Sequence, residues 1–179
     1  MAGGGTRAID ELVRAGVPHV VHEYVPHAPG GAEGGRRPAW GEAAAAALGI
    51  DPARIHKTLI ATVDGRLAVA VVPVAADLDL KALATALGGR KAELAVPLAA
   101  ERSSGYVRGG ISPLGQRRRL PTVLDSTALD HPTIFVSAGR RGLQVELTPE
   151  DLAHLTGSIL ARLSRPRRLG ASAPEPDPT

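Results

Sequence analysis

The sequence predicts an α+β fold in which helices pack outside a mixed, mostly antiparallel and curled sheet. Three observations lead to this fold class. Short strand patterns outnumber helical ones, several neighbouring strands are joined by tight-turn signals, and the regular strand–helix alternation of a doubly wound parallel sheet is missing. The chain has 179 residues, which is the length of one domain with a single core.

Helices and strands can be placed along the chain from capping, turn and hydrophobic patterns. A first helix follows Thr6 as its N-cap and stops at Gly16, and a last helix follows Thr148 and extends to about residue 163. Asp64-Gly65 is a strong signal for a hairpin between its two flanking strands. Strands are expected at residues 19–25, 57–63, 66–72, 122–125, 133–137 and 143–147, and further helical segments at 42–48, 79–87 and 98–102.

Both ends of the chain are expected to be disordered, because they carry too little apolar surface to offset the entropy of ordering. Residues 1–5 are rich in glycine, and residues 165–179 contain four prolines and no aromatic residue. One folded domain is therefore expected over residues 6–164. Residues 28–40 are rich in glycine and proline and are expected to form a loop within it.

Composition excludes several classes of protein. Cysteine is absent, which excludes a disulfide scaffold, a thiolate metal site and a cysteine nucleophile. The sequence contains neither a signal peptide nor an apolar run long enough to span a bilayer, so a cytoplasmic protein without membrane contact is expected. Only four aromatic residues occur, too few for a module that reads RNA by base stacking.

A histidine-rich segment superficially resembles the zinc-binding HExxH motif. The motif places two histidines four residues apart on one helical face, whereas His22 and His27 are five apart. Pro26 would also break that helix. No metal site is therefore expected from His19, His22 and His27.

The glycine-rich segment around Ser112 does not fit a serine nucleophile. It follows G-x-S-x-x-G instead of G-x-S-x-G, and Pro113 has no N–H to donate to an oxyanion. One interpretation is a structural turn. The other is a loop whose adjacent glycines, Gly109 and Gly110, let the backbone approach a ligand closely. No dinucleotide or P-loop fingerprint occurs, and no cofactor is expected.

Basic residues are unevenly distributed. Only three of the 21 are lysines, and the rest are arginines. Arg117–Arg119 follow the glycine-rich segment and Arg140-Arg141 lie in a later turn, which indicates either contact with a polyanion or a solvated surface. Lys57 begins a hairpin strand, where it either faces solvent or supplies a compact ammonium group that arginine cannot replace.

Several of these residues lie in strings that resemble the YbaK/EbsC family. The strings are Ile55-His56-Lys57-Thr58-Leu59-Ile60, the apolar run 68–73, the segment RSSGYVRGGISPLGQ at 102–116, and the segments 119–122 and 136–143. The resemblance covers residues 6–163 in one register, and the segment 102–116 is highly specific. The chain departs from the family's Cys-tRNA(Pro) deacylases in its long 28–40 loop, in Ala138 where they have glycine and in Gln144 where they have aspartate.

The resemblance implies a barrel-like editing-domain sheet and a trans-editing enzyme. Its reaction is hydrolysis of the ester that joins a wrong amino acid to tRNA, and the bacterial Cys-tRNA(Pro) deacylases are the most similar branch. The family is related to the editing insertion of prolyl-tRNA synthetases. The implied partners are mischarged tRNA(Pro) and, as a candidate, prolyl-tRNA synthetase.

The resemblance also implies roles for individual residues. Lys57 is the family's essential lysine, and Gly109-x-x-x-Pro113 is its substrate-cradling loop, which includes Gly110 and Ser112. Further pocket positions are Tyr24, Thr58, Ser137 and Gly139, and the residues expected to contact the tRNA backbone are Arg117, Arg118, Arg119, Arg140 and Arg141. Two other functions stay open: a tRNA-binding homologue without catalytic activity, and an interaction module of a synthetase complex.

Overall fold

The computed structural model describes residues 5–26 and 39–167, and its sheet confirms the predicted fold class. The strands are β1 (Val20–Glu23), β2 (Ile55–Val63), β3 (Arg66–Pro73), β4 (Ala76–Leu78), β5 (Ala92–Leu94), β6 (Thr122–Asp125), β7 (Ile134–Ser137), β8 (Leu143–Leu147), β9 (Ile159–Ala161) and β10 (Ser164–Pro166). The helices are α1 (Arg7–Ala15), α2 (Trp40–Leu48), α3 (Leu80–Ala86), α4 (Pro97–Ser104) and α5 (Pro149–Thr156), with a short 3₁₀ turn at Ser126–Asp130.

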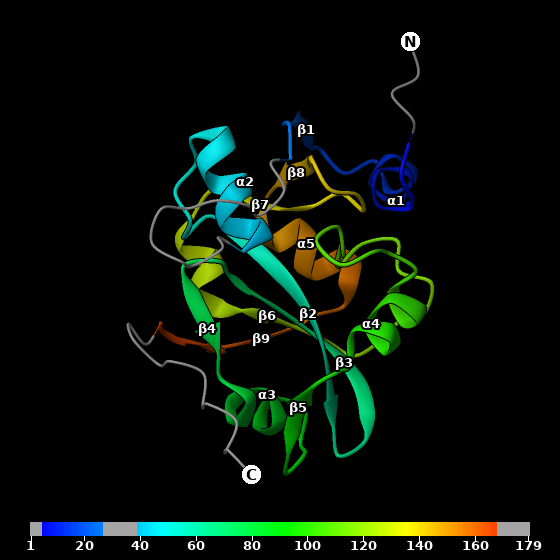
Figure 1. Cartoon of the computed structure of the whole chain (residues 1–179), viewed down its shortest axis with the longest axis vertical. Coiled ribbons are helices and arrows are strands. Elements are labelled where there is room, and N and C mark those ends of the chain that lie inside the picture. Colours follow the sequence, from blue (N-terminus) through cyan, green and yellow to red (C-terminus); the bar gives the residue numbers. More distant parts are fainter. Residues whose placement is uncertain (1–4, 27–38, 168–179) are drawn as a thin grey trace, which may run out of the picture.

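The main sheet is mixed. Its strand order is β1-β8-β7-β2-β3-β6-β9, and β5 pairs with β2 outside this path. The pairs β2–β7, β3–β6 and β6–β9 are parallel, and the others are antiparallel. In Figure 1 the long β2–β3 hairpin reaches the end of the molecule at which α3 and β5 lie, while α1 and α2 lie toward the opposite end.

Local sequence signals explain where the predicted elements begin and end. The Thr6 hydroxyl accepts a hydrogen bond from the N–H of Ile9, and Gly16 ends α1 in the left-handed conformation. Asp64 and Gly65 both have positive φ angles, 48° and 80°, as a type I′ hairpin turn requires, and they join β2 to β3 with Val63 opposite Arg66. The hairpin and the first helix are confirmed.

The C-terminal part differs from the prediction. The last helix ends at Gly157, whose φ is 63°, and not near residue 163. The chain then forms β9, which pairs with β6. A tail is expected from residue 165, but Arg165 and Pro166 belong to β10, which pairs with β4. Described structure therefore continues to Arg167, while residues 1–4, most of the 28–40 loop and residues 168–179 lie outside the described residues.

The apolar core lies on both faces of the sheet. Successive residues of β2 point to opposite faces, so Ile60 and Ala61 belong to different clusters. The first cluster contains Leu12 of α1 and Leu152 of α5, and the second contains Leu83 of α3. Within the described ranges no helix is long and apolar enough to cross a membrane.

Candidate active site

A gap in the main sheet determines where the principal cavity forms. Strand β2 pairs with β7 only through Ile55 and His56, and with β5 only through residues 61–63. Between these partners, residues 57–59 pair with β3 alone, while the carbonyl oxygen of Ile60 also accepts from the N–H of Ala95 at 3.0 Å. A cavity of about 370 Å³ lies beside this open edge. Its walls come from β2, α2, α4 and the loop after α4. The lining residues are 55–60 of β2, Trp40 and Gly41 of α2, Pro97, Ala100 and Glu101 of α4, Arg108, Gly109 and Ile111 of the loop, and Tyr24, Ala39, Leu94, Ala95, Ser137 and Gln144.

Lys57 is the cationic group on the β2 wall of this cavity. Its Nζ donates a hydrogen bond to the carbonyl oxygen of Ala76 at 2.7 Å, which fixes the end of the side chain. Burial lowers the pKa of Lys57, and the charge of Asp77 opposes that shift only in part. When the amine is protonated, two further N–H donors remain after the bond to Ala76.

Four buried polar atoms around the cavity have no hydrogen-bond partner among the described residues. They are His56 Nε2, Thr58 Oγ1, Ser137 Oγ and Gln144 Oε1, and all four residues line the cavity. Ser137 and Gln144 lie opposite each other in the β7–β8 pair. Buried polar groups are nearly always paired, so each of these four atoms is a candidate partner for water or for a polar ligand at the cavity.

His56 is neutral at physiological pH. Desolvation by burial lowers its pKa to about 4. Its Nδ1 lies 3.2 Å from the carbonyl oxygen of Arg54, and a neutral ring can make this hydrogen bond only with its proton on Nδ1. Nε2 is then an acceptor, like the amide oxygen of Gln144.

The rim of the cavity is formed by stacked side chains from distant segments. The guanidinium of Arg141 lies 4.4 Å from the centre of the Trp40 ring, and its Nε donates to the carbonyl oxygen of Arg108 at 2.9 Å. Gly109 follows Arg108 and has a φ of 87°. These contacts join α2, the loop after α4 and the turn between β7 and β8 on one side of the cavity.

The structure brings five of the predicted site residues together. Tyr24, Lys57, Thr58, Gly109 and Ser137 all line the cavity. They come from segments far apart in the sequence, so their convergence depends on the pairing of β2 with β7 and on the loop after α4.

The structure does not bring the other predicted pocket residues to the lining of this cavity. At Gly110 a Cβ would lie 2.9 Å from the Cα of Arg140, so this glycine permits contact between two backbones. The hydroxyl of Ser112 is buried and accepts from the N–H of Leu114. Pro113 lines a different cavity. At Gly139, whose φ is 95°, a Cβ would lie 2.7 Å from the Tyr106 ring.

The predicted basic residues divide into two groups. Arg117, Arg118 and Arg119 come at the C-terminal end of the loop after α4, and all three are exposed. Arg140 pairs with Glu23 at 3.0 Å, while Arg141 stacks on Trp40 at the rim of the cavity.

Histidine and acidic side chains of the described segments form no group of three or more that could hold a metal ion. The ring of His22 instead pairs with the carboxylate of Glu146 at 2.9 Å. His27 lies outside the described residues.

Sequence reasoning missed three features of the cavity. His56 precedes Lys57, but nothing in the local pattern indicates that its ring is buried without a partner for Nε2. Trp40 is one of four aromatic residues and could have been singled out for that reason. The contact of Lys57 with Ala76 depends on β4, a three-residue strand with no clear sequence signal.

Comparison with known proteins places this chain in a family. The model of the aminoacyl-tRNA editing domain matches residues 39–155. The chain is 43% identical over 125 residues to the Enterococcus faecalis protein named "Putative Cys-tRNA(Pro)/Cys-tRNA(Cys) deacylase EbsC", a match that covers 69% of this chain and 76% of the relative. It is 29% identical over 118 residues to the uncharacterized Bacillus subtilis protein YwhH, covering 65% of this chain and 74% of that protein.

A solved structure shares the fold. The crystal structure described as "a putative trans-editing enzyme for prolyl tRNA synthetase" superposes with a TM-score of 0.77, covers 92% of this chain and 99% of its own, and is 24% identical. The family-model match, together with the shared fold, identifies an aminoacyl-tRNA editing domain. The chain belongs to the aminoacyl-tRNA editing family that includes the YbaK/EbsC proteins. Editing removes an amino acid from its tRNA by hydrolysis of the ester, so the chain is an aminoacyl-tRNA deacylase whose substrate is tRNA.

Proposed function

We propose that this deacylase acts in trans on Cys-tRNA(Pro), with the aminoacyl ester bound in the cavity beside Lys57. The observation that carries the proposal is the group of four unpartnered polar atoms around that cavity. An α-amino group can donate to the acceptors His56 Nε2 and Gln144 Oε1, and hydroxyls of the terminal ribose can pair with Thr58 and Ser137. The relative EbsC carries Cys-tRNA(Pro) in its name, which supports this substrate.

Lys57 is proposed to act by charge. An ammonium at the open edge of β2 can hold the phosphate or ribose region of the terminal adenosine, or stabilise the oxygen that becomes negative when the ester carbonyl is attacked. The bond to Ala76 orients the ammonium before the substrate arrives, so little reorganisation is needed during the reaction.

The described residues of the cavity supply no activated hydroxyl or thiol as a nucleophile. The chain has no cysteine, and the hydroxyls of Thr58 and Ser137 have no hydrogen bond to a base among the described residues. We therefore assign the nucleophile to the substrate. The cysteinyl sulfur attacks its own ester carbonyl, a C–S bond forms, the bond from carbonyl carbon to ribose oxygen breaks, and the thiol proton passes to that oxygen. Water then opens the resulting thiolactone to free cysteine.

The loop after α4 is proposed to position the ester through Gly109, which lines the cavity. Gly110, Ser112 and Pro113 of the same loop would act indirectly. Gly110 packs against Arg140 of the β7–β8 turn, and the Ser112 hydroxyl accepts from the N–H of Leu114 within the loop, while Pro113 lines the other cavity. Arg117, Arg118, Arg119, Arg140 and Arg141 are proposed to contact the tRNA backbone, and prolyl-tRNA synthetase is a candidate partner that would deliver mischarged tRNA(Pro).

Deacylation assays with Cys-, Ala- and Pro-tRNA(Pro) test this function. Cys-tRNA(Pro) should be hydrolysed fastest, because alanine lacks the thiol and proline lacks both the thiol and a primary amine. Equal rates for Cys- and Ala-tRNA(Pro) would contradict substrate assistance. Binding of tRNA without hydrolysis would identify a silent tRNA-binding homologue, and absence of tRNA binding would favour the interaction module.

A further inference from the structure

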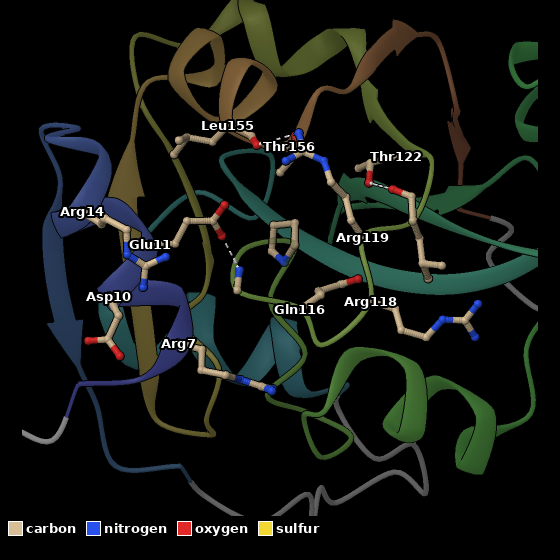
Figure 2. A pocket seen from close by; sticks show the side chains of 13 residues that line it. Arg7, Asp10, Glu11, Arg14, Gln116, Arg118, Arg119, Thr122, Leu155 and Thr156 are labelled. Carbon is tan, nitrogen blue, oxygen red and sulfur yellow. Dashed lines mark hydrogen bonds between the residues drawn. The ribbon is translucent and has the colours of Figure 1, made fainter.

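A second cavity lies on the other side of the loop that follows α4. It measures about 350 Å³ and shares no lining residue with the cavity around Lys57. Helix α1, the segment from Pro113 to Thr122 and the end of α5 form its walls (Figure 2). The loop thus separates two cavities: Gly109 and Ile111 face the first, and Pro113 and Gly115 face the second.

The charge of this second cavity is predominantly positive. Four arginines line it against two acidic residues. One of the acids, Glu11, accepts a hydrogen bond from the N–H of Gly115, which ties α1 to the loop (Figure 2). The other, Asp10, is exposed.

Two of the four arginines are held by the protein. Arg7 donates to the carbonyl oxygens of Ser104 and Gly105, at 3.1 and 2.8 Å, and lies over the Tyr106 ring. Arg119 makes a long hydrogen bond of 3.4 Å to the carbonyl oxygen of Leu155.

The other two arginines have no such partners. The side chains of Arg14 and Arg118 make no hydrogen bond or ion pair within the described part of the chain, and both are exposed. In Figure 2 they lie on opposite sides of the cavity, with Gln116 between them. Two guanidinium groups without acidic partners, supported by two fixed ones, are an arrangement typical of a phosphate-binding site.

We propose that this cavity, the Arg14–Arg118 cleft, binds phosphodiester groups of the tRNA while the 3′ end occupies the cavity around Lys57. The inference rests on the proposed function for the choice of tRNA as the ligand. A polymer is favoured over a small anion, because the same loop walls both cavities and a single bound strand can pass from one to the other. Arg14 and Arg7 of α1 thereby extend the expected tRNA-contact surface from Arg117–Arg119 across the cavity.

Binding of deacylated tRNA(Pro) at several salt concentrations tests the cleft without relying on hydrolysis. The double variant Arg14→Gln/Arg118→Gln removes two positive charges and no described side-chain contact. The matched control, Arg66→Gln/Arg90→Gln, removes the same charge beside the β2–β3 turn, away from both cavities. Two lost phosphate contacts should raise the Kd about tenfold at moderate salt and reduce the log–log salt slope by about 1.5 units. The control should change both quantities much less, and melting temperatures should confirm that both variants are folded.

Three results would overturn the proposal. The first is an equal loss of affinity in the two double variants, which would reflect net charge alone. The second is unchanged tRNA binding in both. The third is saturable binding of inorganic phosphate or ATP that requires Arg14 and Arg118, together with a tRNA affinity that does not require them. This result would assign the cleft to a small anion. If tRNA affinity depends on the cleft but Cys-tRNA(Pro) is not hydrolysed, the proposed action on Cys-tRNA(Pro) fails and the cleft assignment stands.

Discussion

Gly109 lies directly against the indole of Trp40, so that a Cβ on this glycine would come within 2.9 Å of the ring. The φ of Gly109 is 87°, a conformation that other residues adopt only with strain. The glycine is therefore required by the packing of the loop on α2 and not by open space for the substrate. Because Arg141 stacks on the same indole, this contact sets the position of the cavity rim.

Gly109→Ala should lower kcat/KM by about tenfold or more and reduce the free energy of unfolding by about 1–2 kcal/mol, the typical strain of a left-handed alanine. Gly88→Ala is the matched control. Its φ is 70°, and a Cβ there meets nothing within 4 Å, so it should lose stability alone. In a Trp40→Ala background the activity loss caused by Gly109→Ala should shrink. An equal loss in both backgrounds would show that Trp40 does not transmit the effect.

Lys57→Ala should lower kcat/KM by about 100-fold or more while the melting temperature changes little, because the amine acts on the substrate and its described hydrogen bond is to the partly exposed Ala76, outside the apolar core. Lys57→Arg should fail as well, since a planar guanidinium cannot keep the single 2.7 Å bond to Ala76 in the same space. Lys81→Ala, at an exposed position of α3, is the control and should retain full activity. Wild-type rates in Lys57→Ala would remove this residue from the mechanism.

Capping and turn residues in the sequence correctly predicted those helices and strands whose ends are determined by neighbouring residues in the chain. Thr6, Gly16 and Asp64-Gly65 each have one physical role, and the structure confirms the elements that they bound. The failures come from tertiary contacts. Strands β4, β5, β9 and β10 have three residues each, too few to show a periodicity, and they exist because β2, β6 and each other offer them a pairing edge.

The candidate site was predicted only in part, because the rest of it also depends on tertiary contacts. Lys57 and the 102–116 string could be found from a family resemblance, but Gly110, Ser112 and Pro113, which are close to Gly109 in the chain, do not line the cavity with it. The gap between β7 and β5 could not be found, because it depends on where two strands leave β2. Without knowledge of that gap, the sequence does not show which side of the loop faces the cavity. It also does not show that four predicted residues lie outside the cavity lining: Gly110, Ser112, Pro113 and Gly139.

Asp125→Asn should destabilise the C-terminal strands. The Asp125 carboxylate is fully buried and accepts hydrogen bonds from the N–H groups of Leu163, Ser164 and Thr127 and from the Thr127 hydroxyl. Burial alone would raise the pKa of Asp125, but these hydrogen bonds outweigh it and the pKa lies below its ordinary value of 3.8. Since an amide accepts more weakly than a carboxylate and part of these four bonds is lost, the unfolding free energy should fall by about 1–3 kcal/mol at pH 7.

The same carboxylate predicts a pH effect. A folded-state pKa below the unfolded value stabilises the protein above the unfolded pKa, and this stability is lost as the pH falls below about 4 and through the folded pKa. Urea denaturation between pH 5 and pH 3 should show a steeper loss in wild type than in Asp125→Asn. Asp130→Asn, at an exposed position, should follow wild type. Equal slopes in all three would contradict the assignment.

Protonation of His56 should lower the free energy of unfolding in a pH range above the one in which Asp125 acts. Its pKa of about 4 lies below the ordinary value of 6.5, so the unfolded chain binds more protons between these values. Stability therefore rises with pH across this window and is lost as the pH falls from 6.5 toward 4. Between pH 7 and pH 5, wild type should lose about 2 kcal/mol more unfolding free energy than His56→Phe, which cannot be protonated. An identical loss in the two proteins would show that His56 is hydrated in the folded state.

Ser137→Ala and Thr58→Val separate function from stability at the cavity. Neither hydroxyl has a partner among the described residues, so removing it relieves a desolvation cost, and the unfolding free energy should stay equal or rise by up to about 1 kcal/mol. The kcat/KM for Cys-tRNA(Pro) should fall by about tenfold in each variant, because the lost hydrogen bond forms only with the substrate.

Ser104→Ala provides the opposite control. The Ser104 hydroxyl is also buried, but it donates to the carbonyl oxygen of Ala100 at 2.7 Å and accepts from the N–H of Tyr106. Its removal should therefore lower stability by about 1–2 kcal/mol. If Ser137→Ala and Thr58→Val also lose stability and keep full activity, the two hydroxyls have hidden structural partners, and the cavity is not arranged around the ester. A loss of activity at unchanged or higher stability would instead tie the unpaired hydroxyls to substrate binding.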